Sequence, residues 1–226
     1  MVQITNVKVY DLEECVIASR NAMRITPPEY TKEEFEKSLV RAKKLVQASA
    51  KDKHVKCHDN FLTGIRVSFD IKYPQYFTPE LQRYHFIDIV ASSSKMHKLM
   101  AMRIDECCNE YVDKERVEAT QRDCDLYNHI VEHHIDKMEF GLRNGEVRVA
   151  TTYDDCLYYA RMIALSNCPL GLELFMRIST NYKQLQTIYW QRKNHRLRED
   201  WGNYENFIKS LPYSADFITG EYAEQV

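Results

Sequence analysis

The chain has 226 residues, of which 44% are hydrophobic and 28% charged, and its formal net charge is −2. This length suits one well-buried domain, and the near-neutral charge gives no general attraction for nucleic acid or for a membrane surface. No apolar run approaches the roughly 20 residues that span a bilayer, and the first residues lack a basic region followed by an apolar stretch. We therefore expect a single cytoplasmic domain over residues 1–226 that binds neither a nucleic-acid polymer nor a membrane.

The seven cysteines include the adjacent pair Cys107 and Cys108, and their spacing fits neither a zinc site nor a disulfide framework. Reduced thiols that pack as small apolar side chains are the expected state.

The first half of the chain alternates strand and helix signals. Residues 3–10 are expected to form a strand, and Asp11 to cap a helix that runs to about Met23. Thr31 and Glu34 form a capping box before a helical pattern of apolar residues. Ile65, Val67, Phe69 and Ile71 alternate strictly, which predicts a strand over 65–71.

The rest of the chain, from residue 78 onward, is mostly helical in pattern. Thr78 and Pro79 start a predicted helix that runs to about Ala91, because proline is favoured at the first helical position. Further helices are predicted within 113–135 and over 153–166, 181–195 and 201–211. The inventory predicts an α+β fold, mostly helical with a small antiparallel sheet.

His129 and His133 are the first and last residues of the sequence His-Ile-Val-Glu-His, which has the spacing of an inverted zinc-protease motif. Histidines four residues apart on a helix can bind one metal, but a catalytic zinc site needs a third protein ligand. A solvated helix face is the alternative, so we expect no metal site.

Two polar segments are candidates for ligand binding. The turn Ser92-Ser93-Ser94-Lys95 offers hydroxyls, backbone N–H groups and an ammonium, which suit a phosphate, although such turns are often only turns. The helix 181–195 carries amides and cations, which could serve binding or only solvation. In the solvated case Arg192 would be a surface residue paired with Glu199 or Asp200.

Read together, two stretches resemble the flavin-dependent thymidylate synthase family. The segment HDNFLTGIRVSFDIKYPQYFTPELQRYHFIDIVASSSKMHKL is similar to the family's stretch from a His through a strand to the signature R-H-R-x-x-S-x-N-E-x-S-x-R-Y. The segment YYARMIALSNCPLGLELFMRISTNYKQLQTIYWQRKNHRL is similar to its A-R segment and N-x-R-x-L helix. Ala160-Arg161 take the A-R position, and Lys183 replaces the Arg of N-x-R-x-L.

The resemblance implies methylation at C5 of dUMP to give dTMP, with FAD, NADPH and methylenetetrahydrofolate as cofactors. It also implies a pyrimidine nucleoside monophosphate as substrate and a homotetramer as the assembly. The implied catalytic residue is Arg192, which would stabilise negative charge developing on the pyrimidine ring. The implied cofactor-binding residues are His85, Asn181, Lys183, Thr187 and His195. The implied substrate-binding residues are Gln82, Arg83, Ser93, Ser94, Lys95 and Arg192.

The signature itself is altered, since Tyr84 and Phe86 stand where the family has the two arginines of R-H-R. A shift by one residue would instead align Arg83, Ser93 and Lys95. The departures leave two alternatives to the methylation: a flavin- or nucleotide-binding homologue without catalysis or with another substrate, and a zinc hydrolase built on His129 and His133.

Overall fold

The computed structural model describes residues 1–51 and 58–220, so Cys57 lies outside the described residues. The chain forms two compact units, and each is described by itself. The larger unit comprises Val2–Lys72, Pro79–Ala91 and Met176–Val226, and the smaller comprises Met1, Tyr73–Thr78 and Ser92–Phe175. Single-domain organisation stays a prediction.

The elements follow one another along the chain as strands, helices and short helical turns. In chain order they are β1 (Gln3–Tyr10), α1 (Leu12–Ala18), a 3₁₀ turn (Asn21–Met23), α2 (Lys32–Lys51), 3₁₀ turn η2 (Asn60–Thr63), β2 (Arg66–Pro74), a 3₁₀ turn (Gln75–Phe77), α3 (Thr78–Leu81), β3 (Asp88–Ser92), α4 (Lys95–Lys98), a 3₁₀ turn (Leu99–Ala101), α5 (Ile104–Cys107), α6 (Lys114–His133), β4 (Met138–Gly141), β5 (Val147–Ala150), α7 (Tyr153–Asn167), β6 (Glu173–Asn181), α8 (Tyr182–Arg192), α9 (Arg198–Ser210) and a π-helical turn (Ala215–Thr219).

A four-stranded sheet of order β1-β2-β6-β3 organises the larger unit. Strands β1 and β2 are antiparallel, and their register pairs Gln3 with Lys72 and Tyr10 with Arg66. Alternate residues of β2, among them Val67 and Phe69, are fully buried, as the alternation in the sequence predicted. The strand predictions for 3–10 and 65–71 are therefore confirmed.

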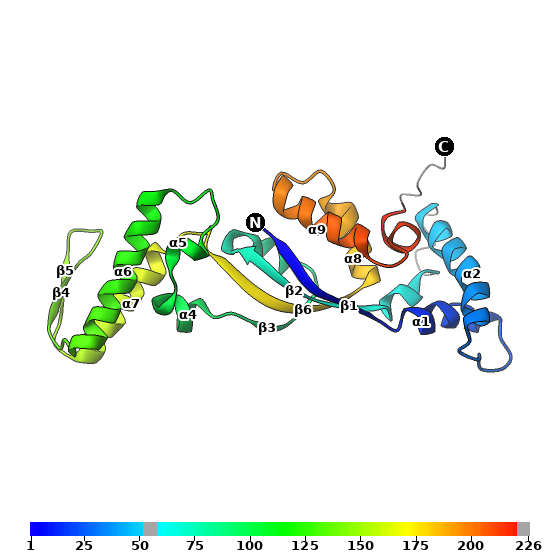
Figure 1. Ribbon diagram of the computed structural model, residues 1–226, viewed down its shortest axis with the longest axis horizontal. Helices are drawn as coiled ribbons and strands as arrows, with labels where there is room; N and C mark the ends of the chain where they lie inside the picture. The colour runs from blue at the N-terminus through cyan, green and yellow to red at the C-terminus, as the bar shows by residue number, and fades with distance from the viewer. Residues whose placement is uncertain (52–57, 221–226) are drawn as a thin grey trace. The chain divides into compact units, whose positions relative to one another are not determined.

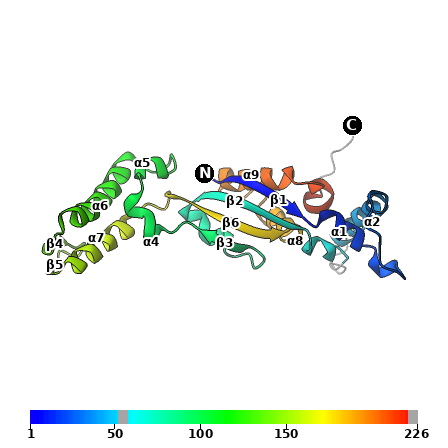
Figure 2. The same ribbon diagram turned by 60° about the horizontal axis from the view of Figure 1, so that its bottom comes forward.

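Helices α8 and α9 cover one face of this sheet (Figures 1 and 2). Phe69 of β2 packs against Tyr204 and Phe207 of α9, with ring centroids 6.1 and 4.6 Å apart. Trp201, one turn earlier on α9, is also buried. The core beneath the helices is thus largely aromatic, which stabilises the position of α8 and α9 on the sheet.

Of the two helix caps predicted in the first part of the chain, that of Thr31 is confirmed and that of Asp11 is wrong. The hydroxyl of Thr31 accepts a hydrogen bond from the N–H of Glu34 at 3.2 Å, as expected of a capping box. Asp11 precedes α1 in the left-handed region (φ 58°), and its side chain caps nothing. The helix ends at Ala18 rather than near Met23, and a 3₁₀ turn follows.

The smaller unit contains the helix pair α6 and α7 and the hairpin β4-β5 (Figure 2). Asp113 caps α6 through the N–H of Arg116 at 2.8 Å, and Thr152 caps α7 through the N–H of Asp155 at 3.2 Å. The hairpin's Phe140 is buried with residues of both helices. The buried members of this cluster are Ile130, Phe140, Ala150, Cys156 and Ala160.

The prediction of one helix from Thr78 to about Ala91 is wrong. Helix α3 ends at Leu81, and residues 88–92 form strand β3 at the edge of the sheet. The β-branched residues Ile89 and Val90 favour an extended backbone, and pairing with the sheet outweighs the helical spacing of Leu81 and Tyr84. Strand β6 and the hairpin β4-β5 were not predicted, and α9 begins three residues earlier than expected.

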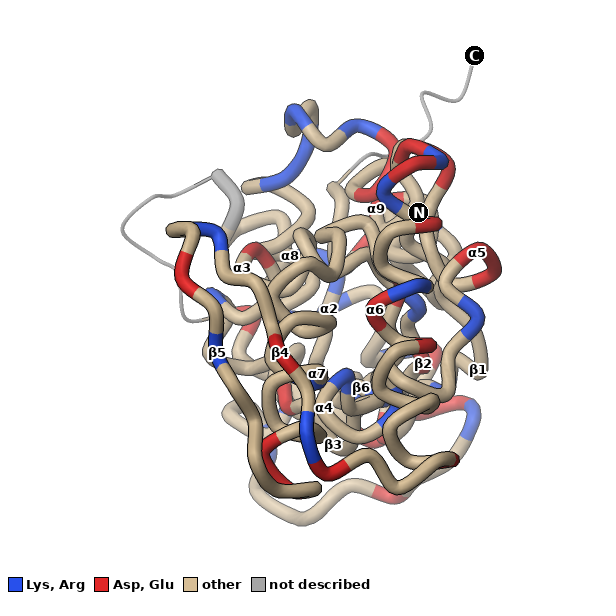
Figure 3. The backbone as a smooth tube through the Cα atoms, turned by 90° about the vertical axis from the view of Figure 1, so that its left-hand side faces the viewer, with Lys and Arg blue, Asp and Glu red and all other residues tan. Residues whose placement is uncertain are grey.

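The architecture is α+β, as predicted, with small antiparallel pairings among the strands. Basic and acidic positions are interspersed along the backbone, in keeping with the net charge of −2 (Figure 3). Among the described residues, no helix combines the length and apolarity needed to cross a bilayer.

Candidate functional site

Helix α8 supplies one wall of a cleft in the larger unit. Strand β6 passes directly into α8 at Asn181, whose side-chain oxygen caps the helix by accepting the N–H of Gln184 at 2.8 Å. Gln184, Thr187 and Gln191 then follow at helical spacing and face the cleft. Arg192, the last residue of α8, completes this wall.

The opposite wall is the connection between α3 and β3. The hydroxyl of Thr180 on β6 donates to the carbonyl of Phe86 at 2.8 Å and fixes this connection to the sheet. The Phe86 side chain is 66% exposed, although it is aromatic. The cleft between the two walls measures about 420 Å³, within the usual range of small-molecule sites. Its lining residues on this side are Arg83, Tyr84, His85 and Phe86.

The guanidinium of Arg192 is held by groups of the same chain. Its Nε donates to the hydroxyl of Tyr84 at 2.6 Å, and its Nη1 lies 2.7 Å from Oε2 of Glu80. That oxygen is buried and has no aligned hydrogen-bond donor, so the contact is ionic. Nη2 also donates to the backbone carbonyl of Glu80 at 3.4 Å. The group lies 4.7 Å from the ring centre of Trp201, in range of a cation–π contact.

The alternative in which Arg192 is a surface residue paired with Glu199 or Asp200 is therefore wrong. The Arg192 side chain is only 11% exposed, and its acidic partner is Glu80 rather than Glu199 or Asp200. The carboxylate of Asp200 is buried and accepts the backbone N–H of Val2 at 3.0 Å. Burial raises the pKa of the Tyr84 hydroxyl, which the Arg192 contact opposes, so Tyr84 faces the guanidinium as a neutral phenol.

His195 borders the same ion pair. Its Nδ1 accepts the backbone N–H of Leu197 at 3.2 Å, and its Nε2 lies 3.2 Å from Nη1 of Arg192 and 4.0 Å from Oε2 of Glu80. A neutral imidazole has a single acceptor nitrogen. Because Nδ1 accepts, Nε2 carries the hydrogen, so its contact with the Nη1 donor of Arg192 is no hydrogen bond.

Two of the residues implied for flavin binding serve the structure first. Asn181 is 9% exposed and caps α8. The Lys183 ammonium forms an ion pair with Asp59, whose side chain is 3% exposed, and donates to Oε1 of Gln186 at 3.1 Å. Both residues stabilise the start of α8 and lie outside the lining of the cleft.

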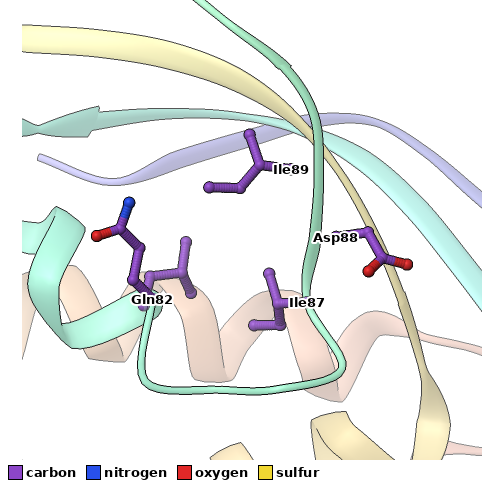
Figure 4. A pocket seen from close by; sticks show the side chains of 5 residues that line it. Gln82, Ile87, Asp88 and Ile89 are labelled. Carbon is purple, nitrogen blue, oxygen red and sulfur yellow. The ribbon is translucent and has the colours of Figure 1, made fainter.

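The structure brings most of the remaining predicted residues of the larger unit to the cleft. Arg83, His85, Thr187 and Arg192 line it. Gln82 instead lines a neighbouring pocket of about 380 Å³ with Leu81, Ile87, Asp88 and Ile89. Figure 4 shows Ile87 and Ile89 pointing toward Gln82, while Asp88 points away.

Ser93, Ser94 and Lys95 belong to the smaller unit. Ser93 exchanges two hydrogen bonds with the backbone of Phe175: its N–H donates at 2.8 Å, and its hydroxyl accepts at 3.0 Å. Lys95 donates from Nζ to Oε1 of Gln75 at 3.5 Å. Ser94 precedes α4, and its hydroxyl does not cap that helix. Arg161, on the A-R position, donates to the hydroxyl of Tyr127 at 2.6 Å within this unit.

The two histidines of the zinc motif face each other on α6. The rings of His129 and His133 have centroids 4.4 Å apart, and both side chains are exposed. Over residues 1–51 and 58–220, no three His, Cys, Asp or Glu side chains converge as a metal site. A zinc hydrolase therefore has no assembled third ligand in the part of the chain that the structure describes.

The cysteines of the described residues are free thiols. Burial raises the pKa of Cys108 and of Cys124 to about 11, so both stay protonated at neutral pH. Burial also raises the pKa of Cys15 and of Cys156. Since the thiolate is the nucleophile, these residues act as packing groups.

The sequence matches no family model and no curated protein. Two solved structures of flavin-dependent thymidylate synthase ThyX from Helicobacter pylori, both with FAD and dUMP, are similar in fold. One superposes with a TM-score of 0.58 at 13% identity and covers 95% of this chain and 97% of that chain. The other has a TM-score of 0.56 at 14% identity and covers 96% and 95%. The chain thus has the fold of flavin-dependent thymidylate synthases.

Proposed function

We propose that the protein is a cytoplasmic, flavin-dependent enzyme that methylates C5 of a pyrimidine deoxynucleoside monophosphate, converting dUMP to dTMP. FAD would be the resident cofactor, with NADPH as reductant and methylenetetrahydrofolate as carbon donor. The observation that carries this proposal is the cleft between residues 83–86 and α8, in a fold shared with enzymes solved with FAD and dUMP.

The cleft residues fit a flat heteroaromatic ring. Exposed Phe86 offers a stacking face, and the amides of Gln184 and Gln191 and the hydroxyl of Thr187 offer hydrogen bonds to a polar ring edge. The volume of about 420 Å³ accommodates one ring system rather than a whole dinucleotide. Bound flavin would supply the hydride transfer, while His85 and Thr187 orient the ring.

Arg192 would stabilise negative charge on the pyrimidine ring. Its guanidinium is held by Glu80, Tyr84 and Trp201, so it needs no reorganisation when charge develops. Asn181, Lys183 and His195 would act through α8 and its following turn, by keeping Arg192 and Thr187 in place.

The nucleotide phosphate would bind at Ser93, Ser94 and Lys95, with Gln82 and Arg83 as further substrate contacts. Lys95→Ala is expected to weaken binding of dUMP by about 1.5–3 kcal/mol, the usual value of a charge-assisted hydrogen bond, and to leave deoxyuridine binding unchanged. Calorimetric titration of both ligands measures this difference. Lys98→Ala, on the same short helix, is the matched control, and equal losses for the two ligands would contradict a phosphate subsite.

A homotetramer would complete the site. All five residues of β3 are exposed, including Ile89 and Val90, and an apolar edge strand of this kind favours association. Light scattering at micromolar concentration is expected to give about four times 26.8 kDa. A stable monomer would contradict a site shared between subunits.

A second candidate function is binding without catalysis. The observation that favours it is the Glu80 carboxylate beside Arg192, because the negative charge offsets the cation that would stabilise the reacting ring. Flavin or nucleotide would then bind in the cleft and undergo no methylation.

Two measurements on the purified protein test these functions. Flavin absorbance, or its appearance on addition of FAD, is expected of the enzyme and of a flavin-binding homologue. Tritium release from C5-labelled dUMP, with dCMP as the alternative base, is expected only of the enzyme. A protein that takes up neither FAD nor a pyrimidine nucleotide contradicts both proposals, and one that takes up FAD without tritium release on either base is a binding homologue.

A further inference from the structure

We infer that Glu80 is a positioning residue that cancels the resting charge of Arg192, so that the cleft accepts an uncharged heteroaromatic ring and rejects preformed anions such as phosphate at this point, while N–H groups of Arg192 remain for charge that develops on a bound ring. This inference rests on the proposed ligand class, and it goes beyond it by naming the residue that sets the specificity. It concerns the ring-binding cleft and leaves the separate phosphate subsite aside.

The first observation is the hydrogen bonding of the guanidinium. Recognition of a carboxylate or phosphate by arginine uses two parallel N–H groups on neighbouring nitrogens. In Arg192 the Nε faces Tyr84, while Nη1 and Nη2 face the side chain and the carbonyl of Glu80. Each nitrogen already faces an oxygen of the same chain, so an anion could approach the guanidinium only in competition with the Glu80 carboxylate.

The second observation is the electrostatics of the pair. The side chains of Arg192 and Glu80 are 11% and 22% exposed, and the distance from Nη1 to Oε2 is 2.7 Å. At this separation and burial, solvent and salt screen the pair weakly, and its net charge is zero. The other nearby cation, Arg83, lies 3.7 Å from Oε1 of the same carboxylate and is 67% exposed, so water screens its charge.

The third observation is that the position of the Arg192 guanidinium does not depend on the charge of Glu80. Helix α3 holds the Glu80 backbone, whose carbonyl also contacts Nη2. Stacking on Trp201 and the bond to Tyr84 fix the plane of the guanidinium independently. Glu80→Gln therefore keeps the size and an acceptor oxygen, and it removes only the negative charge.

The test compares an anion with an uncharged ring in the same proteins. Inorganic phosphate is titrated by calorimetry, and riboflavin by quenching of its fluorescence. The single variant Arg192→Gln is expected to bind phosphate with the same affinity as the wild type. Glu80→Gln is expected to gain phosphate affinity by about tenfold or more, because one unmasked cation becomes available. Glu80→Asp keeps the negative charge, so its phosphate affinity is expected to stay close to that of the wild type. The affinity for riboflavin is expected to change little in all of these variants.

The double variant Glu80→Gln/Arg192→Gln is expected to return phosphate affinity to the wild-type value, which shows that the gain acts through Arg192. A merely structural role for Glu80 predicts loss of riboflavin binding and no gain of phosphate binding. Glu34→Gln is a matched stability control, because Glu34 also lies between two arginines, Arg20 and Arg24, and is 23% exposed. It is expected to lower the melting temperature similarly and to leave riboflavin affinity unchanged.

The outcomes separate this inference from the proposed function. Unchanged phosphate affinity in Glu80→Gln, or Arg192-dependent phosphate binding in the wild type, overturns the role of Glu80 even where riboflavin binds. Absence of riboflavin binding in every variant contradicts the flavin site, while an Arg192-dependent gain of phosphate affinity still supports the charge-cancelling role.

Discussion

Arg192→Lys is expected to lower turnover on dUMP by about 100-fold or more, as for the loss of a preorganised donor. Lysine keeps the positive charge beside Glu80 but loses the planar fork. A single ammonium cannot contact the hydroxyl of Tyr84, the carboxylate of Glu80 and the backbone carbonyl of Glu80 while it also lies over Trp201. Tritium release from C5-labelled dUMP measures the effect.

The control for this variant is Arg148→Lys, an exposed residue of the hairpin β4-β5. It is expected to leave turnover unchanged. Since lysine keeps the ion pair, Arg192→Lys is expected to unfold at a temperature closer to that of the wild type than Arg192→Gln, which leaves the mostly buried Glu80 carboxylate only its longer contact with the exposed Arg83. Turnover of Arg192→Lys equal to that of the wild type would remove Arg192 from the mechanism.

Phe69→Ala is expected to lower the free energy of unfolding by about 3–5 kcal/mol, as for a buried aromatic residue whose removal leaves a cavity. Phe69 is fully buried on β2, and its ring lies against Tyr204 and Phe207 of α9. Urea denaturation followed by circular dichroism measures the change.

Tyr30→Ala is the control for this core substitution, because the Tyr30 side chain is 63% exposed outside the sheet and helices. Its free energy of unfolding is expected to stay within about 0.5 kcal/mol of the wild type. A loss for Phe69→Ala no larger than that of Tyr30→Ala would contradict the aromatic core between β2 and α9.

The parts of the fold that the sequence predicted are those in which one face of an element is buried. Val67, Phe69 and Ile71 alternate because β2 has one core face, and the long helices carry capping residues such as Asp113 and Thr152. Strand β6 has the same alternation in Leu174, Met176 and Ile178, so it was open to prediction. Strand β3 was not, because all five of its residues are exposed and no alternation of burial marks it.

Some features of the candidate site could likewise be predicted from the sequence, and others could not. The amide-rich face of α8 was visible in the sequence because its residues repeat at helical spacing. The partner of Arg192 was not, since Glu80 is distant along the chain and only the tertiary structure brings α3 beside the end of α8. The caps and ion pairs of Asn181 and Lys183 likewise appear only once β6 and the segment at Asp59 are in place.

The direct passage of β6 into α8 has a mechanical consequence. No loop separates the strand from the helix, and the Asn181 cap fixes the junction, so the wall formed by Gln184, Thr187 and Gln191 has no hinge of its own. The opposite wall is joined to β6 by the hydrogen bond between Thr180 and Phe86 and to α8 by the contacts of Arg192. Both walls of the cleft are therefore held on the same strand, β6, and the Thr180–Phe86 hydrogen bond and the contacts of Arg192 set the width of the cleft.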